Sequence, residues 1–368
     1  MTMLHSTVGL SFRSKLDGLF LLQTGPTMSG AAFLALGGIG GVVVTGDHGK
    51  SGLTSSSAAA VKELRRLAPD FFLMWDSEPY TQVEATKDAP FFLPAAGLFG
   101  PISLADRLAD QRGMGVSVAL TPTGHLQALD VDALQAVITT ANAEPGDDIV
   151  VHLPLDEAWL VARSYRYVLE AVRESRHPIA ISLASDRNPT SSAEASVALQ
   201  HLAIESAVPL LLLRCDLEGL DFIARGGTAA AFGMSSKLRH GVSRAKSGRK
   251  FDVRDQRPSL AIEHFLSYMR PKRIEVDYAS AIAPTCGCDE CRGLPLDRFT
   301  DDDASHASAR RHNALVALAL HSRMTSSVDR LGTWREMVNE AQGNYFAESL
   351  VLGNKKFVEP GQFKVWAR

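Results

Sequence analysis

Short apolar runs alternate with helix-compatible segments along most of the chain. Eight runs rich in Val, Ile, Leu and Phe each end in a polar or Gly/Pro cluster, as buried parallel strands of an α/β protein do. The eight runs cover residues 19–23, 41–45, 71–76, 116–121, 149–155, 179–185, 208–214 and 229–235. Connecting segments with helical composition or spacing lie at residues 56–67, 131–141, 157–174 and 193–205. This alternation predicts an α/β protein with a (β/α)8 barrel, the TIM-barrel fold.

A doubly wound open sheet is the alternative to the barrel. Such a sheet binds dinucleotides through a Gly-x-Gly-x-x-Gly turn after its first strand. Here the pairs Gly37-Gly38 and Gly40-Gly41 come before a strand, and no such motif follows the first run. The sequence therefore favours the barrel.

Polar side chains gather where the predicted strands end. In a barrel these positions meet at the carboxyl-terminal face, where catalytic groups lie. A single Asp at such a position can also be an ordinary helix cap. The polar clusters are Gln23-Thr24, Asp47-His48, Asp76-Ser77-Glu78, residues 121–125, Asp156-Glu157, Asp186-Arg187, residues 214–216 and residues 235–237.

Overall composition describes a chain with a substantial core and little net charge. The 368 residues are 45% hydrophobic, and the formal net charge is −3. Affinity for a polyanion must therefore come from a local cluster of basic residues. No apolar run approaches the roughly 18–20 residues of a membrane span, and the first residues lack a signal-peptide layout. We expect a cytoplasmic protein that does not enter a membrane.

One segment directly after the last predicted strand is strongly basic. Between residues 237 and 257 it carries Lys237, Arg239, Arg244, Lys246, Arg249, Lys250, Arg254 and Arg257 against Asp252 and Asp255. At the end of a barrel strand these side chains can meet the phosphates of a nucleic acid. The alternative is a solvated charged loop. We expect Lys237, Arg239, Arg244 and Arg249 to contact the substrate.

Three of the four cysteines fall within six positions. The pattern Cys286-x-Cys288-x-x-Cys291 offers close-set thiolates, which suits a metal site in a reducing compartment better than disulfides. His312, at the start of an apolar helical stretch, is the favoured fourth ligand, with His306 in reserve. Three thiolates and one imidazole form the ligand set of a structural zinc site, so zinc is the expected cofactor.

This thiol pattern, followed by His312-Asn313 and a long helix, resembles the zinc-binding tail of the tRNA-guanine transglycosylase superfamily. Two strand ends add to the resemblance, at residues 73–77 (Leu-Met-Trp-Asp-Ser) and 153–157 (Leu-Pro-Leu-Asp-Glu). The specific part of the match covers residues 276–340. The resemblance implies a barrel at residues 1–270, a zinc-binding subdomain with a closing helix at 271–342, and a tail at 343–368.

Members of this superfamily exchange guanine in tRNA, and in divergent cases in DNA, for a 7-deazaguanine base. The resemblance gives Asp156 the role of reading the base, since a carboxylate accepts from guanine N1–H and the exocyclic amine together. Asp76 corresponds to the second pocket carboxylate, an acid/base or positioning group. Ser77 and Glu157 follow these acids in the two motifs and are expected beside the base.

The chain departs from the superfamily at the last barrel strand. The nucleophilic Asp of the transglycosylases belongs there, but residues 228–235 contain no carboxylate. Either the strand register differs, or Asp76, Asp216 or Asp252 attacks, or covalent catalysis is lost. The leading hypothesis is a pentosyltransferase that exchanges guanine for a 7-deazaguanine in DNA or tRNA. The alternatives are an inactive nucleic-acid-binding subunit of a homo- or heterodimer and an unrelated barrel hydrolase with a structural zinc.

Overall fold

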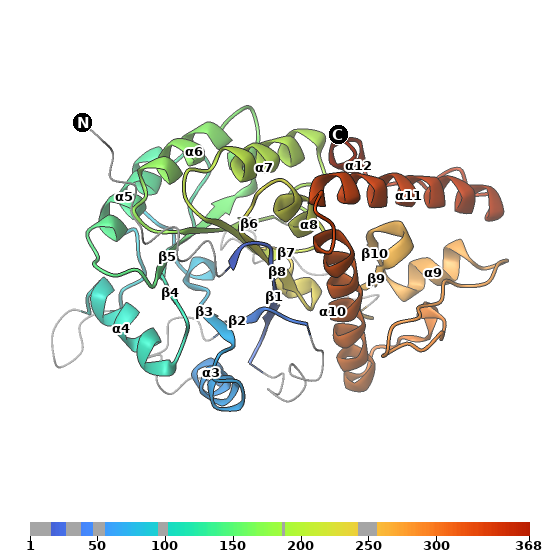
Figure 1. Ribbon diagram of the computed structural model, residues 1–368, viewed down its shortest axis with the longest axis horizontal. Coiled ribbons are helices and arrows are strands. Elements are labelled where there is room, and N and C mark those ends of the chain that lie inside the picture. Colours follow the sequence, from blue (N-terminus) through green and yellow to red (C-terminus); the bar gives the residue numbers. More distant parts are fainter. Residues whose placement is uncertain (1–15, 27–37, 47–55, 95–101, 186–187, 242–255) are drawn as a thin grey trace.

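The computed structural model describes residues 16–26, 38–46, 56–94, 102–185, 188–241 and 256–368 (Figure 1). Eight parallel strands form one nearly closed barrel in the order β3-β2-β1-β8-β7-β6-β5-β4. The strands are β1 (Leu19–Thr24), β2 (Gly41–Thr45), β3 (Phe72–Asp76), β4 (Ala119–Leu120), β5 (Ile149–Asp156), β6 (Ile179–Ala184), β7 (Leu210–Cys215) and β8 (Ala229–Gly233). Every strand that the sequence predicts is present, and the (β/α)8 barrel is confirmed.

The two edge strands of this sheet, β3 and β4, are joined through Ser117. The Ser117 backbone N–H donates to the Leu73 carbonyl at 2.7 Å, and the Leu73 N–H donates to the Ser117 hydroxyl at 3.0 Å. Because β4 is short, the backbone N–H and C=O of Leu73 on β3 have no partner strand, and these two bonds satisfy them. The sheet therefore closes on itself, which rules out the open doubly wound alternative.

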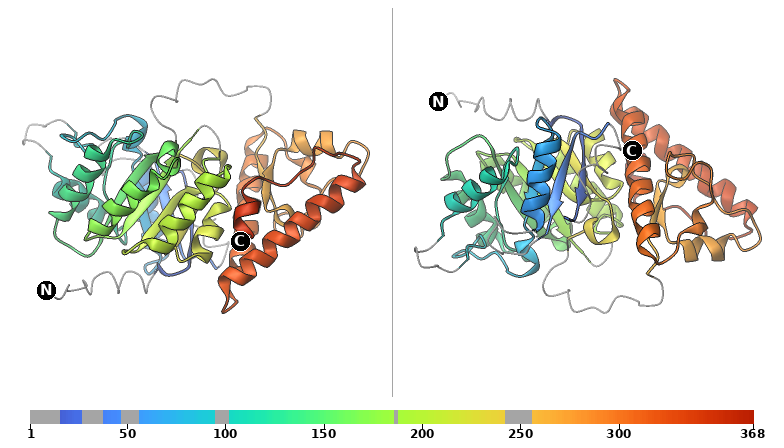
Figure 2. Two further views of the ribbon diagram at one scale, coloured as in Figure 1. Left: turned by 90° about the horizontal axis from the view of Figure 1, so that it is seen from above. Right: turned by 90° about the horizontal axis from the view of Figure 1, so that it is seen from below.

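Helices cover the outer face of the barrel (Figures 1 and 2). They are α3 (Ser56–Leu67), α4 (Leu104–Met114), α5 (Val131–Asn142), α6 (Tyr165–Glu174), α7 (Ala193–Glu205) and α8 (Glu218–Ala224). The single helix predicted over residues 157–174 is wrong. A short 3-10 turn, η3 (Glu157–Leu160), precedes α6, because Ala162 and Arg163 adopt left-handed backbone conformations with φ of 50° and 66° that interrupt a helix.

Alternation along the strands separates two apolar layers. Leu21, Val43, Met74 and Val150 belong to the cluster that fills the barrel interior. Their strand neighbours, such as Trp75, belong to the cluster between the barrel wall and the helices. Trp75 is therefore a core residue, as alternation beside Asp76 predicts.

The C-terminal part of the chain lies beside the barrel at its β1 and β8 side (Figure 2). A two-stranded antiparallel sheet comes first, and two long helices then form a V. The elements are β9 (Leu260–Ile262), β10 (Ser267–Met269), α9 (Pro271–Asp277), α10 (Asp303–Thr325), α11 (Arg330–Val351) and α12 (Phe363–Trp366). Helix α11 runs through position 343, where the sequence suggested the start of a tail.

Buried polar contacts fix this part to the barrel. On α10, His321 Nε2 lies 2.7 Å from the Gly18 carbonyl oxygen before β1. On α11, the Trp334 indole N–H donates to the buried Asp221 of α8 at 2.9 Å. The aromatic tail is also packed, since Tyr345, Phe357 and Trp366 are all buried. Among the described residues, no helix combines the length and the apolar character needed to cross a membrane.

Candidate functional site

The barrel mouth, meaning the carboxyl-terminal ends of the barrel strands, is lined by a polar layer. Because side chains alternate, the residue two positions beyond each interior apolar residue also faces inward. That residue is polar on five strands, where the layer consists of Gln23, Thr45, Asp76, His152 and Ser182. All five side chains are buried. The sequence thus changes from an apolar barrel floor to a polar mouth within two residues on each of these strands.

Asp76, at the end of β3, is held by several donors. Its Oδ2 accepts from the Tyr80 hydroxyl at 2.7 Å and from Gln23 Nε2 at 3.1 Å, and its Oδ1 accepts from the Glu78 backbone N–H at 3.0 Å. Arg214 Nη1 lies 3.7 Å from Oδ2. Both carboxylate oxygens of Asp76 accept hydrogen bonds, and the residue is fully buried. Asp76 therefore holds Tyr80, Gln23 and Glu78 in position.

Arg214 is the centre of this network, and it reaches the mouth because of a bulge. The register of β7 against β8 shifts between Leu212 and Cys215, and Arg214 has a left-handed φ of 53°. Its guanidinium pairs with Glu78, donates to the Tyr80 hydroxyl at 2.9 Å, and donates to the His240 and Lys237 carbonyl oxygens at 3.2 and 2.6 Å. Arg214 therefore joins β3, β7 and the segment after β8.

Burial and the charge of Arg214 set the protonation states around it. Burial opposes the charge of Arg214, yet Tyr80, Glu78 and Asp76 together keep its pKa above the ordinary value. Burial, with a smaller contribution from Arg214, lowers the pKa of His152 to about 3. His152 is therefore neutral near pH 7, with its Nε2 2.9 Å from the Ser182 hydroxyl.

Asp156, at the end of β5, lies at the same carboxyl-terminal rim as Asp76, because β3 and β5 are parallel members of one barrel. Its Oδ1 accepts from the Ala158 N–H at 3.0 Å and caps η3. Its Oδ2 lies 3.8 Å from Nε2 of the buried His125, whose two ring nitrogens have no hydrogen-bond partner among the described residues. The roles assigned to both acids from the resemblance stay predictions.

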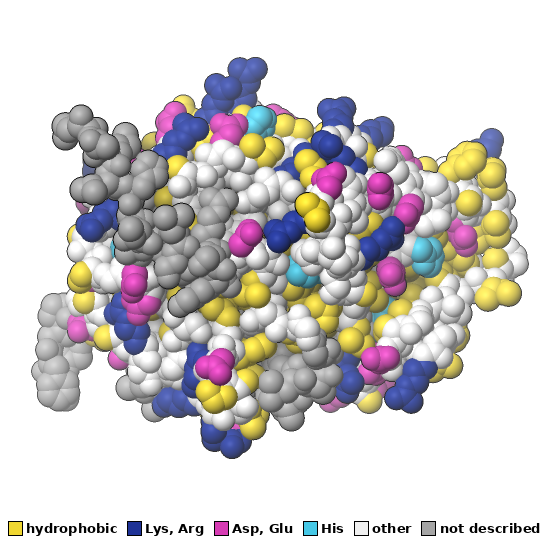
Figure 3. Space-filling model, viewed as in Figure 1, with side chains coloured by type: hydrophobic (Ala, Val, Ile, Leu, Met, Phe, Trp, Pro, Cys, Tyr) yellow, Lys and Arg dark blue, Asp and Glu magenta, His cyan; other side chains and the backbone are white. Residues whose placement is uncertain are grey.

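The other residues expected at the substrate divide between the interior and the surface. Ser77 is buried, and Glu157 accepts from the Ser185 hydroxyl. Lys237 is exposed, but Arg239 is turned inward and buried. Arg244 and Arg249 lie outside the described residues, as does most of the basic segment. On the face seen in Figure 3, the described Lys and Arg side chains are spread among acidic ones without forming one basic patch.

The structure confirms that the last barrel strand offers no carboxylate. Strand β8 ends at Gly233, so the register expected from the sequence holds. A Cβ atom at Gly233 would lie 2.3 Å from the Leu238 carbonyl oxygen and 2.6 Å from the Arg239 backbone nitrogen. Any side chain at this position would displace the backbone that follows the strand. Packing therefore excludes a carboxylate side chain at Gly233, the last residue of β8.

Gly233→Ala should destabilise the protein by roughly 2–3 kcal/mol, because the new methyl group collides with backbone instead of a movable side chain. Gly343→Ala is the matched control, since this exposed position inside α11 has open space around it and should gain up to about 1 kcal/mol of stability. Urea unfolding of both variants measures the two effects. Equal stability of Gly233→Ala and the unmodified chain would refute the steric argument.

Asp216, named above as an alternative nucleophile, directly follows β7. Its Oδ2 accepts from Asn188 Nδ2 at 3.3 Å. Burial raises the pKa of Asp216 to about 6, and the positive charge of Arg239 limits this rise. Because the folded-state pKa lies above the ordinary value of 3.8, the folded protein binds more protons than the unfolded chain between these values.

This pKa predicts that the contribution of Asp216 to folding stability falls as pH rises from about 4 through about 6. Asp216→Asn removes the cost of burying the charge, so its stability relative to the unmodified chain should increase by about 1 kcal/mol between pH 5 and pH 8. Chemical denaturation at both pH values gives the difference. A difference that does not change with pH would show that Asp216 titrates normally.

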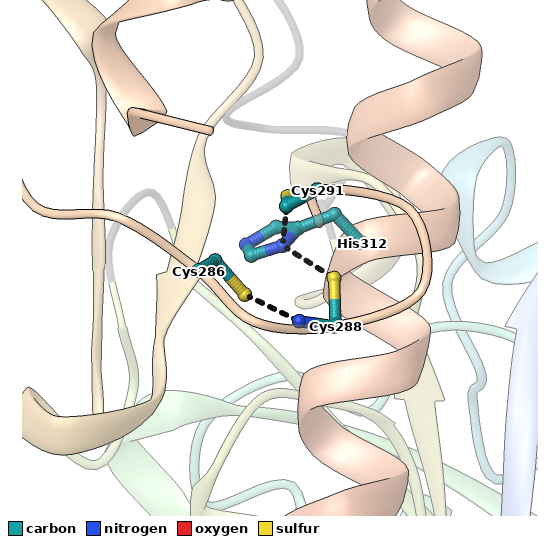
Figure 4. A group of neighbouring side chains, drawn as sticks. All are labelled: Cys286, Cys288, Cys291 and His312. Atoms are coloured by element: carbon teal, nitrogen blue, oxygen red, sulfur yellow. Dashed lines mark hydrogen bonds between the residues drawn. The ribbon is translucent and has the colours of Figure 1, made fainter. Parts of the chain in front are cut away.

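The thiol pattern near the C-terminus folds into one compact cluster with the predicted histidine. The ligand atoms of Cys286, Cys288, Cys291 and His312 all lie within 4.8 Å of one another (Figure 4). His312 Nδ1 is 3.5 Å from Cys288 Sγ and 3.2 Å from Cys291 Sγ. The chemistry of three thiolates and an imidazole fits a tetrahedral metal site. His306 is not a member, since its Nε2 instead lies 3.0 Å from Asp301.

Contacts around the cluster prepare it for a metal ion. His312 Nε2 lies 2.8 Å from the Ala261 carbonyl oxygen, so this nitrogen carries the proton and Nδ1 is left to bind a metal. The neighbouring Cys286 and Cys291 thiols hold the pKa of Cys288 well below that of a free thiol. Arg298 donates to Cys291 Sγ at 3.3 Å and offsets part of the negative charge of three thiolates.

We expect about one metal ion per purified chain, with all four residues as ligands. Cys288→Ser should lose most of this metal to EDTA and should lower the unfolding temperature, because binding stabilises only the folded cluster. Elemental analysis after dialysis measures the occupancy. Cys215→Ala is the control, because Cys215 is buried in the barrel wall and should not affect the metal content. Full occupancy in Cys288→Ser would exclude Cys288 as a ligand.

Comparisons with known proteins place the chain in no family. No family model and no curated protein matches it. Among solved structures, it is similar to a chain from Burkholderia cenocepacia J2315 described as a "putative phosphonomutase", with 14% sequence identity and a TM-score of 0.35. The similarity covers 61% of this chain and 91% of that chain. A match this distant assigns no activity, so function has to be argued from the site itself.

Proposed function

We propose that this protein is an enzyme that exchanges guanine in DNA or tRNA for a 7-deazaguanine base, and that the ion in its thiol cluster is zinc. The observation that carries the proposal is the position of Asp156 and Asp76 on one rim of the barrel, in a chain that also carries the thiol-rich cluster. Zinc is the metal that closed sites of three thiolates and one imidazole most often hold.

In this proposal Asp156 reads the base. Guanine presents N1–H and its exocyclic amine side by side, and a carboxylate accepts from both. To do so, the Asp156 side chain leaves the Ala158 N–H that it caps. Nε2 of the buried His125 lies 3.8 Å from the Asp156 carboxylate. Asp76, Tyr80 and Arg214 form another, hydrogen-bonded part of the wall of the mouth.

Base exchange also needs a group that attacks or stabilises C1′ of the ribose or deoxyribose while guanine leaves. Asp76 is fully engaged by its donors, and Asp252 lies outside the described residues. Asp216 is the best remaining candidate among the three alternatives. Exposed Lys237 and the basic segment after it would contact phosphates of the polymer next to the mouth.

A specific observation favours a second function, that of a nucleic-acid-binding subunit without catalysis. The backbone of residues 238–239 fills the space where a side chain at Gly233 would project. A chain of this kind would bind the polymer, and a partner chain with its own nucleophile would perform the exchange.

The test is incubation of the full chain with tRNA or duplex DNA and a labelled 7-deazaguanine base. We expect incorporation by the unmodified chain and a loss of at least about 100-fold in Asp156→Asn, because the amide cannot accept from both donors of the base. Asp132→Asn, an exposed position on α5, is the matched control. Filter retention of the labelled polymer reports binding in the same samples.

The outcomes separate the two functions. Polymer binding without incorporation, with incorporation appearing only after a second chain is added, would replace the enzyme by the binding subunit. Incorporation that is equal in Asp156→Asn and the control would remove Asp156 from the site. Absence of both binding and incorporation with every polymer would end the transglycosylase proposal.

A further inference from the structure

A second cavity lies apart from the polar layer of the mouth, between the barrel and the C-terminal part of the chain. It has a volume of about 290 Å³. Asn188, Asp216 and Arg239 line it from the segments after β6, β7 and β8, and Tyr268, Gln362 and Trp366 line it from the opposite side. The cavity therefore exists only because the C-terminal part docks on the barrel.

Arg239 is the unusual group in this cavity. Its side chain is only 5% exposed, and its guanidinium carbon lies 3.8 Å from the centre of the Tyr268 ring. Stacking on Tyr268 occupies one face of the guanidinium and fixes its plane. Nε and Nη2 have no hydrogen-bond partner among the described residues.

These two nitrogens belong to the same edge of the guanidinium. Their N–H bonds run side by side and match two acceptor oxygens of a carboxylate or phosphate group. Leaving a buried charged donor unsatisfied costs stability, which a ligand that accepts both bonds would recover. The edge of Arg239 formed by Nε and Nη2 therefore offers two parallel donors to an anion, and we call this edge the fork.

Asp216 supplies a second, opposite charge in the same cavity. No ion pair within 4.0 Å joins it to Arg239 among the described residues, so the two groups are separated. The charge of Arg239 still lowers the pKa of Asp216, which places the two groups within electrostatic range of each other. A ligand between them would meet a cation at one end and a carboxylate at the other.

We propose that this cavity binds a small molecule with a two-oxygen anionic group seated on the fork of Arg239 and a hydrogen-bond donor directed at Asp216. Carboxylate and phosphate heads share this chemistry. Asn188 and Gln362 offer further polar contacts, and Trp366 provides an apolar wall. Asp216 is also the candidate for the group at C1′ named above, but binding of such a molecule does not require the exchange reaction.

Three probes test the site: glycine, acetate and inorganic phosphate. Each is titrated into the full chain at pH 7.5 and constant ionic strength, with saturation-transfer NMR for glycine and acetate and phosphorus line width for phosphate. We expect glycine to bind more tightly than acetate, because only glycine adds an ammonium group for Asp216. If phosphate binds more tightly than glycine and acetate, the ligand on the fork of Arg239 carries a phosphate group instead of a carboxylate.

Variants assign the binding to the two groups. Arg239→Lys keeps the charge but loses the fork, and should weaken binding of the preferred probe by about 10- to 100-fold. Asp216→Asn should lower the affinity for glycine to the affinity for acetate, and it should leave the affinity for acetate unchanged. Lys364→Gln is the matched control, since it removes an exposed charge from α12 beside Gln362 and Trp366 and should change nothing.

The test stays valid when a variant is less stable. A general loss of structure would weaken the binding of every probe alike, whereas the expected effects differ between the probes. Absence of saturable binding of all three probes would overturn the proposal. Binding that is unchanged in Arg239→Lys, or equally weakened in Lys364→Gln, would also overturn it, because nonspecific attraction of anions would then explain the data.

Discussion

The imidazole of His312 joins α10 to the thiol cluster and to β9 within the C-terminal part of the chain. One ring nitrogen faces the Cys288 and Cys291 thiols, and the other bonds to the Ala261 carbonyl oxygen on β9. The helix that carries His312 continues to His321, which bonds to the backbone in front of β1. A metal ion in the thiol cluster would therefore fix the position of α10, and through α10 the wall of the barrel. The cavity that holds Arg239 depends on this docking, because half of its lining comes from the C-terminal side.

The barrel mouth follows a different constraint, the need to satisfy buried polar groups. Five strands change from apolar to polar inward-facing residues toward their carboxyl ends, and each polar side chain then requires a partner. Gln23 Nε2 donates to Thr45 and Asp76, and His152 pairs with Ser182. Arg214 then holds Glu78 and Tyr80, two further residues whose groups donate to Asp76. The consequence is a rigid mouth with Asp76 fixed inside it. Asp156 is nearer the solvent, with 14% of its side chain exposed.

Sequence patterns located most of the elements and part of the site. All eight strands were predicted because buried parallel strands are continuous apolar runs, and the cluster of three thiols with His312 was predicted because thiols so close in sequence have few other uses. Other features left no such signal. The break between η3 and α6 depends on two left-handed residues, Ala162 and Arg163, in a segment of helical composition. The inward direction of Arg214 depends on a bulge, and neither can be read from residue type.

The sequence by itself determined the fold and the members of the thiol cluster, because alternation, apolar run length and cysteine spacing are local properties that a linear pattern preserves. Only the tertiary structure decided which charged groups meet. Arg239, which the sequence places in a basic segment, is buried beside Tyr268. The backbone of residues 238–239 occupies the space next to Gly233. The contact of Arg239 with Tyr268 depends on the distance between segments far apart in the chain. That distance is set by the packing of the C-terminal part against the barrel, which no local pattern records.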